Sequence, residues 1–167
     1  IVSPHMNTLF PLEPEFPEGF SYFPNFISDA EEANLLKEVS KIDLHAFNFH
    51  GFEAKRKVAS FGFDYSFDNN ALSKGKEIPA EFHRLIKQVA HHISIEPSDF
   101  KELLVTEYPV GAVINWHRDA PPFDIITGIS LASDCIFRLR PHEKTKQERA
   151  SIVSFSVERR SLYVIKD

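Results

Sequence analysis

The chain of 167 residues contains very little cysteine, methionine, tryptophan or glycine. Its single cysteine, Cys135, excludes an internal disulfide, so we expect a reducing compartment and, by default, the cytoplasm. No apolar run approaches the roughly 20 residues of a membrane-spanning helix, and no basic segment followed by an apolar one predicts a signal peptide. The net charge of -5 argues against a surface coated with positive charge for nonspecific nucleic-acid binding, although a local basic patch is compatible with it.

Phenylalanine and proline, by contrast, are plentiful, with 16 and 11 residues. A hydrophobic content of 43% over this length is enough for one domain with a real core. Residues 1–5 resemble an expression-tag remnant, because Met6 is the only methionine and the natural initiator. Residues 6–25 are rich in Pro and Phe, which predicts an extended N-terminal arm packed on the core. The domain itself is expected over residues 26–167.

Two helices and a series of short strands are predicted from periodicity. Ser28 and Glu31 fit a capping box ahead of a helix over residues 29–42, and a second helix begins near Pro79 and ends near Ile93. Alternating segments predict strands, namely SFGFDYSF, ELLVTEY, GAVINW, DIITGISL, CIFRLR, SIVSFSV and SLYVIK. Cys135, inside one of them, is expected to be a small core residue. The fold class is therefore mainly β with two flanking helices (α+β), in a sandwich or small barrel.

His117 and Asp119 form the most informative pair of polar residues. In an extended strand, residues two apart share a face, so both side chains could reach one metal ion. A face of two His and one carboxylate leaves three positions open on Fe(II) for oxygen and a cosubstrate. A surface polar cluster is the alternative for this short motif.

The surrounding sequence resembles the AlkB-like family of Fe(II) and 2-oxoglutarate-dependent dioxygenases. EYPVGAVINWHRD is similar to the family's Tyr-x-x-Gly and His-x-Asp segment, and GISLASDCIFRLR is similar to the two strands that follow it. FGFDYSF with IPAEFHRLIKQVA is similar to the substrate-side hairpin and the next helix. The resemblance covers about residues 20–167 and implies a double-stranded β-helix, a jelly-roll, cupin-like core.

The resemblance also implies roles for individual residues. His117 and Asp119 match the first two iron ligands, which are the catalytic and metal-binding positions, and Tyr108 matches a residue that binds 2-oxoglutarate. The cosubstrate's pocket would also contain Leu104, Ile114, Phe137 and Thr106. The first three of these residues could equally be ordinary core. Thr106 stands where many members of the family have Asn. The cofactors are Fe(II), 2-oxoglutarate as cosubstrate, and O2.

The family's third iron ligand, a His, and the following Arg residues that bind 2-oxoglutarate are absent from the chain. His142 is the only later His and lies in a charged connection, where a solvated turn residue is expected. We therefore expect a C-terminally truncated enzyme that is inactive in this form.

The substrate is the least determined part of the prediction. The implied activity is hydroxylation of N-alkyl groups on nucleic-acid bases, as in oxidative demethylation or DNA repair, on alkylated single-stranded DNA or RNA. Phosphate contacts are expected from Lys55, Arg56 and Lys57, beside a stacking platform of Phe63 and Tyr65, with Arg118 also near the substrate. The alternative for the three basic residues is a solvated strand edge. We expect a monomer without a membrane partner. The alternatives are a hydroxylase of a protein or small molecule with the same fold, and a noncatalytic β-sandwich binding module.

Overall fold

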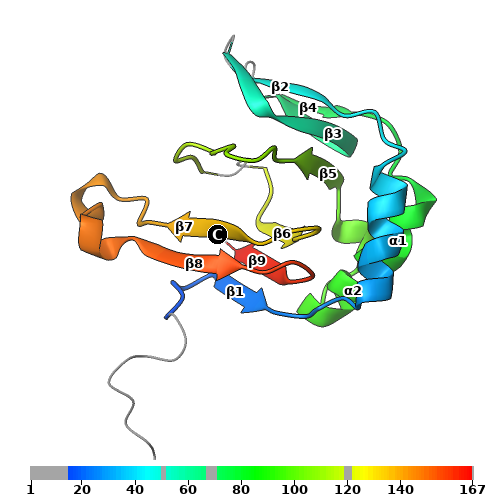
Figure 1. The fold of residues 1–167 in the computed structure, drawn as a ribbon. Coiled ribbons are helices and arrows are strands. Elements are labelled where there is room, and N and C mark those ends of the chain that lie inside the picture. The colour runs from blue at the N-terminus through cyan, green and yellow to red at the C-terminus, as the bar shows by residue number, and fades with distance from the viewer. Residues whose placement is uncertain (1–14, 50–51, 67–70, 119–121, 167) are drawn as a thin grey trace, which may run out of the picture. The chain divides into compact units, whose positions relative to one another are not determined.

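The computed structural model describes residues 15–49, 52–66, 71–118 and 122–166, and their chain divides into two compact units (Figure 1). The first unit, unit 1, comprises residues 1–29 and 124–167, and the second, unit 2, comprises residues 30–123. Their helices and strands are described separately below.

Unit 1 contains two antiparallel sheets. In the first sheet, β9 (Leu162–Lys166) lies between β1 (Phe20–Phe23) and β6 (Ile125–Ile129). The second sheet pairs β7 (Cys135–Leu139) with β8 (Val153–Val157), and the connection between them contains the short 3-10 helices η3 (Lys144–Lys146) and η4 (Arg149–Ser151). Residues far apart in the sequence thus pair directly, since Phe20 lies opposite Ile165.

Aromatic side chains from both sheets make up the core of unit 1. Phe20, Phe155 and Val157 are buried, and the ring of Phe16 packs at 4.8 Å from that of Phe155. The ring of Tyr163 also lies on β9 opposite Gly128 of β6, in the space that a Cβ atom on Gly128 would occupy. The glycine therefore lets the tyrosine ring lie flat across the neighbouring strand.

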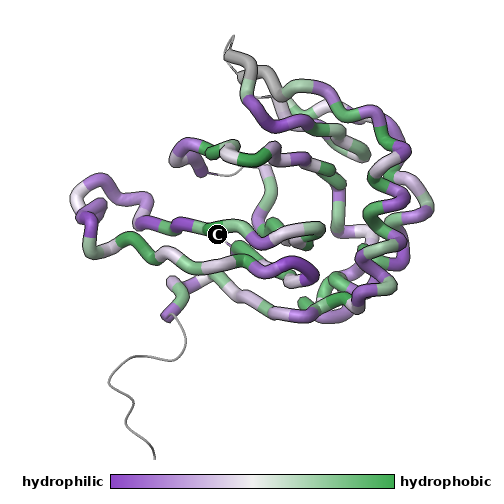
Figure 2. Tube along the Cα trace, in the orientation of Figure 1, coloured by the Kyte–Doolittle hydropathy of each residue, from purple (hydrophilic) through white to green (hydrophobic). Residues whose placement is uncertain are grey.

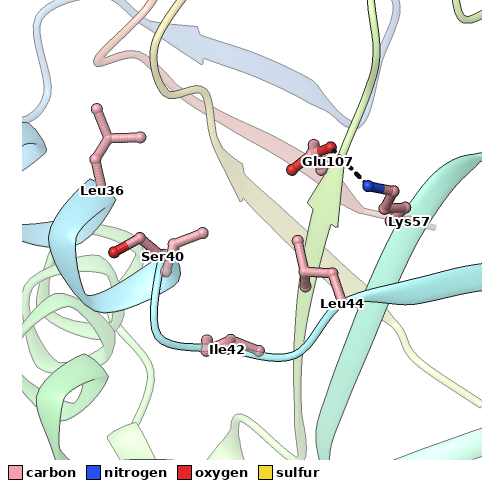
Figure 3. A pocket seen from close by; sticks show the side chains of 7 residues that line it. Leu36, Ser40, Ile42, Leu44, Lys57 and Glu107 are labelled. Carbon is pink, nitrogen blue, oxygen red and sulfur yellow. Dashed lines mark ion pairs between the residues drawn. The ribbon is translucent and has the colours of Figure 1, made fainter.

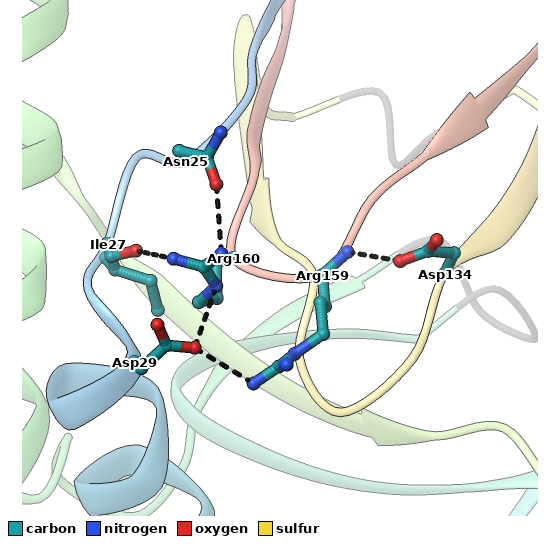
Figure 4. Close-up of polar contacts among 6 residues, drawn as sticks. All are labelled: Asn25, Ile27, Asp29, Asp134, Arg159 and Arg160. Atoms are coloured by element: carbon teal, nitrogen blue, oxygen red, sulfur yellow. Dashed lines mark hydrogen bonds and ion pairs between the residues drawn. The ribbon is translucent and has the colours of Figure 1, made fainter.

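The turn between β8 and β9 is tied to the segment before the first helix by two arginines (Figure 4). The guanidinium of Arg160 donates to the side-chain oxygen of Asn25 at 3.0 Å and lies 3.4 Å from a carboxylate oxygen of Asp29. Arg159 reaches the same Asp29 oxygen at 3.3 Å, and its backbone N–H donates to Asp134 at 2.8 Å. Within unit 1, these contacts hold the segment from Asn25 to Asp29, the first residue of α1 (Asp29–Val39), to the β8–β9 turn.

Unit 2 is built around one long strand. β3 (Phe52–Ser66) pairs with β2 (His45–Phe49), β4 (Ala71–Lys74) and β5 (Glu102–Glu107), all antiparallel. The helices of this unit are α1, η1 (Ala80–Phe82), α2 (His83–Ile93) and η2 (Pro97–Asp99). Val58 and Ala59 on β3 are buried, as are Val89 and Ala90 on α2.

Both predicted helices are confirmed, although the first ends at Val39 and not at residue 42. The second begins as predicted just after Pro79, but its first turn is the 3-10 helix η1, and the regular α-helix starts at His83. It ends at Ile93, where Ser94 adopts a left-handed conformation with φ of 60°. Figure 2 shows hydrophilic and hydrophobic residues mixed along both helices, as the predicted amphipathic pattern requires.

The mainly β class with two helices is confirmed, but three details of the strand prediction are wrong. Residues 111–116, predicted as a strand, have no regular secondary structure. The strands β1, β2 and β4 were not predicted, because each is short and is held by a neighbouring strand. Cys135 is exposed rather than a core residue: it shares a face of β7 with the half-buried Phe137, but it is the first residue of the strand and lies at its end.

Within the part of the chain that the structure describes, none of the helices is both long and apolar enough to cross a membrane.

Candidate functional site

His117 lies in an irregular segment that follows β5, and not on a strand as predicted. The segment opens with a turn in which the N–H of Ala112 donates to the carbonyl of Pro109 at 2.9 Å, with Gly111 at a φ of +76°. Residues 111–116 pair with no strand among the described residues, so the predicted strand does not form. Asp119 lies outside the described residues, so the shared face of the two side chains stays a prediction.

The imidazole of His117 is oriented by its own backbone. Its Nδ1 lies 2.8 Å from the carbonyl oxygen of Asn115, and because a carbonyl only accepts, Nδ1 carries the proton and donates. The ring lone pair is then on Nε2, the nitrogen that can ligate a metal. A metal-binding His commonly donates its other N–H to a carbonyl in this way, so His117 fits an Fe(II) ligand.

The remaining ligands are not gathered in the described residues. Among residues 15–49, 52–66, 71–118 and 122–166, no group of three or more His, Cys, Asp or Glu side chains could hold a metal ion. His142 is exposed in the connection between β7 and β8, which agrees with the solvated turn residue expected there. The donor types of His117 and Asp119, imidazole and carboxylate, suit Fe(II) but fill only part of its coordination sphere.

Two of the predicted cosubstrate residues share one face of unit 2. Leu104 and Thr106 lie on β5 opposite Ser60 and Val58 of β3, and residues directly opposite in an antiparallel pair point to the same face. Leu104 is 50% exposed. This face is therefore partly open, as the wall of a binding site would be.

The other predicted cosubstrate residues are placed differently. Tyr108 directly follows β5 and is 52% exposed, and Ile114 is exposed in the irregular segment. Phe137 belongs to unit 1, where its ring packs 4.8 Å from that of Tyr163 and 6.0 Å from that of Phe155. Phe137 is thus a member of the aromatic core, the alternative that its sequence context left open.

The basic residues of the predicted substrate surface alternate along β3. Lys55 and Lys57 are exposed and Arg56 is half-buried, as expected for side chains that point to opposite faces. Lys57 forms an ion pair with Glu107 of β5 at 3.7 Å. Figure 3 shows this pair beside a hollow of about 360 Å³, whose other lining residues are Leu36, Val39, Ser40, Ile42 and Leu44.

The predicted aromatic platform lies elsewhere on the same strand. Phe63 lines a second hollow of about 320 Å³, together with three lysines that are described below. Since six residues of a strand span roughly 20 Å, Lys57 and Phe63 cannot act on one nucleotide. Tyr65 is half-buried opposite Leu72, and Arg118 is exposed next to His117.

Glu102 is a polar residue that the sequence did not single out. Its carboxylate accepts a hydrogen bond from the Ser60 hydroxyl at 2.9 Å, on the face that also contains Leu104. Burial raises the pKa of Glu102 above its usual 4.5; the bond from Ser60 lowers it in part, and the Asp64 carboxylate raises it further. Only the pairing of β3 with β5 reveals this environment, because the two interacting residues are 42 positions apart.

Comparison with known proteins identifies the family of this chain. The family model described as the 2OG-Fe(II) oxygenase superfamily matches residues 19–166. The solved structure of OsALKBH1 is similar in fold, with a TM-score of 0.65 and 12% sequence identity over 95% of this chain and 82% of that chain. No curated protein matches. Because the family model spans almost every residue, the chain belongs to the 2OG-Fe(II) oxygenase superfamily, whose members use Fe(II), 2-oxoglutarate and O2.

Proposed function

We propose that the protein is an AlkB-like dioxygenase that hydroxylates N-alkyl groups on nucleic-acid bases, within a double-stranded β-helix core. The observation that carries the proposal is the contact of His117 Nδ1 with the Asn115 carbonyl oxygen at 2.8 Å, which places the ring lone pair on Nε2, the atom that would ligate Fe(II). The likeness in fold to OsALKBH1 supports the AlkB-like assignment.

In this proposal His117 and Asp119 bind Fe(II), and Tyr108 donates a hydrogen bond to 2-oxoglutarate beside Leu104, Thr106 and Ile114. When bound, the iron and 2-oxoglutarate supply the activation of O2, with one oxygen atom entering the substrate and the other leaving in succinate. The residues of the chain position the cosubstrate and limit the access of water. A hydroxylated N-methyl carbon then leaves as formaldehyde, which restores the unmodified base.

The open face of Leu104 and the exposed Arg118 favour a large substrate presented from solvent. A base within a duplex cannot reach a pocket, so the substrate would be single-stranded or flipped out. A hydroxylase of a protein or small molecule is the second candidate, and the net charge of -5 favours it.

The test uses the full-length protein supplied with Fe(II), 2-oxoglutarate and an N-methylated single-stranded oligonucleotide. We expect succinate and formaldehyde in equal amounts, and neither from His117→Ala. The same oligonucleotide without the methyl group is the control for uncoupled turnover. If a methylated oligonucleotide does not stimulate succinate formation and a peptide or small molecule does, the second candidate replaces the nucleic-acid assignment.

A further inference from the structure

The second hollow of unit 2, here called the lysine hollow, combines aromatic and basic side chains. Phe63 and Phe100 line it, together with Lys74, Lys76 and Lys101. Its volume of about 320 Å³ is at the lower end of the range for small-molecule sites, which runs from about 300 to 1,000 Å³. A single nucleotide, rather than a folded nucleic acid, fits such a space.

The lysine hollow is positively charged on a negatively charged protein. Its three lysines face one acidic lining residue, Glu77, which gives a local charge of +2 with His83 neutral, against -5 for the whole chain. Within the described residues, no ion pair or side-chain hydrogen bond involves Lys74 or Lys76. The Nζ of Lys101 donates one of its three N–H groups to the carbonyl of Ser98 at 2.7 Å, which holds the side chain in place. This bond does not use the other two N–H groups of the ammonium.

Backbone contacts hold these lysines beside the aromatic ring. Lys74 lies directly opposite Phe63 in the β3–β4 pair, so their side chains are neighbours on one face. The N–H of Gly62 donates to the carbonyl of Lys76 at 2.6 Å, and the N–H of Phe63 donates to that of Lys101 at 2.8 Å. Any Cβ at Gly62 would collide with the Lys101 carbonyl, so the glycine permits the close approach that shapes the hollow.

We propose that the lysine hollow binds one nucleotide of single-stranded nucleic acid, with its phosphate on Lys74 and Lys76 and its base stacked on Phe63. The inference rests on the proposed nucleic-acid substrate and names the residues that hold it. Charge complementarity selects an anion, and the half-buried ring of Phe63, which lines the hollow next to the lysines, selects one that carries a base. This arrangement does not involve Lys57, whose charge is paired with Glu107.

The experiment measures the affinity of the full-length protein for a fluorescent oligo(dT) at several salt concentrations. Lys74→Gln with Lys76→Gln should weaken binding and lower the log-log salt slope by about 0.7 for each lost contact, because fewer counterions are released. Lys144→Gln with Lys146→Gln is the matched control, since it removes the same two charges with the same spacing from the β7–β8 connection. The control should leave affinity and slope close to wild type.

The aromatic contact has a different signature. Phe63→Ala should keep the wild-type salt slope and weaken binding roughly 5- to 150-fold, the equivalent of one stacked base. Phe63→Leu, which retains apolar volume, should show the same direction of change even if the alanine variant fails to fold. Inorganic phosphate should compete only weakly, because it lacks a base.

The outcomes separate this inference from the proposed function. If the hollow variant at Lys74 and Lys76 and the control variant at Lys144 and Lys146 lose equal affinity for oligo(dT), the lysine hollow is overturned and the proposed function is not. The same holds if the wild-type protein binds oligo(dT) and the hollow variants bind it with unchanged affinity. Weakened binding in the hollow variants together with no turnover of methylated oligonucleotide would support the hollow and overturn the proposed reaction. A wild-type protein that binds no oligonucleotide would overturn both.

Discussion

The Nδ1 atom of His117 lies 2.8 Å from the carbonyl oxygen of Asn115, two residues earlier in the chain. This short local contact selects the ring tautomer through a carbonyl only two residues away. A site residue can therefore be oriented by backbone next to it, even though the segment that contains it is not a strand.

The first prediction follows from this contact. His117→Ala should lower the affinity for Fe(II), or for Mn(II) as a stable substitute, by at least tenfold, because an imidazole ligand is lost. Its melting temperature without metal should match wild type, since the side chain is exposed and supplies no core burial. Calorimetry gives the affinity, and a thermal melt is the control for folding. Unchanged Mn(II) affinity would show that His117 is not a ligand.

The second prediction concerns Phe137, which was expected in the cosubstrate pocket and packs in the aromatic core. Phe137→Ala should lower the free energy of unfolding by about 2 to 4 kcal/mol, because it leaves a cavity beside Tyr163 and Phe155. This loss is somewhat smaller than the loss expected for a fully buried ring. Phe137→Leu should cost about half as much, since it keeps most of the volume. Urea denaturation measures both. A Phe137→Ala variant of wild-type stability with weak 2-oxoglutarate binding would return Phe137 to the pocket.

The sequence predicted most reliably those features that depend on neighbouring residues. The period of the apolar residues Phe82, Leu85, Ile86 and Val89 is enough to predict α2, because one amphipathic helix contains its own signal. The 3-10 geometry of the first turn at residues 80–82 does not change this period and so could not be predicted.

Residues 111–116 show why the candidate site was harder to predict. GAVINW has the composition of a strand, but a strand also needs a partner, and the turn at Pro109 and Gly111 directs the chain away from β5. The face of each β3 residue likewise depends on register. The separation of Lys57 from Phe63, and the contact of Ser60 with Glu102, follow from the pairing of β3 with β5, which a single sequence does not display.

The third prediction compares the two arginines of the β8–β9 turn. Arg160 is the more buried, with its side chain 23% exposed, and its guanidinium reaches Asn25, Asp29 and the Ile27 carbonyl. Its Nε lies at ion-pair distance from Asp29 but without hydrogen-bond geometry. Arg160→Lys keeps the charge and loses the branched set of donors, so it should destabilise the protein by about 1 to 2 kcal/mol.

Arg159→Lys is the matched control for this change. Its side chain is 46% exposed, and a half-exposed ion pair contributes about 0 to 1 kcal/mol. Both substitutions leave the charge unchanged, so the difference in urea midpoints reports the hydrogen bonds of Arg160. Equal midpoints for the two variants would show that the Arg160 contacts add nothing beyond its charge.

The last prediction uses the raised pKa of Glu102, whose main cause is burial. A carboxyl whose pKa is higher in the folded than in the unfolded protein binds more protons when folded, so its ionisation destabilises the fold as pH rises. Below the unfolded pKa the group is neutral in both states, and the penalty is absent. Above the folded pKa the penalty is complete.

Glu102→Gln removes this ionisation and keeps an oxygen that can accept the hydrogen bond from Ser60. The variant should therefore be more stable than wild type at pH 7. The difference should shrink as the pH falls through the raised folded pKa, and it should vanish below the usual pKa of 4.5. Urea denaturation at pH 7 and at a pH below 4.5 measures the effect. Glu18→Gln, at an exposed position, is the control for the removal of one surface charge. A Glu102→Gln variant that is less stable than wild type at pH 7 would mean that the ionised carboxylate stabilises the β3–β5 pair, and that the burial of Glu102 is compensated by a partner other than Ser60.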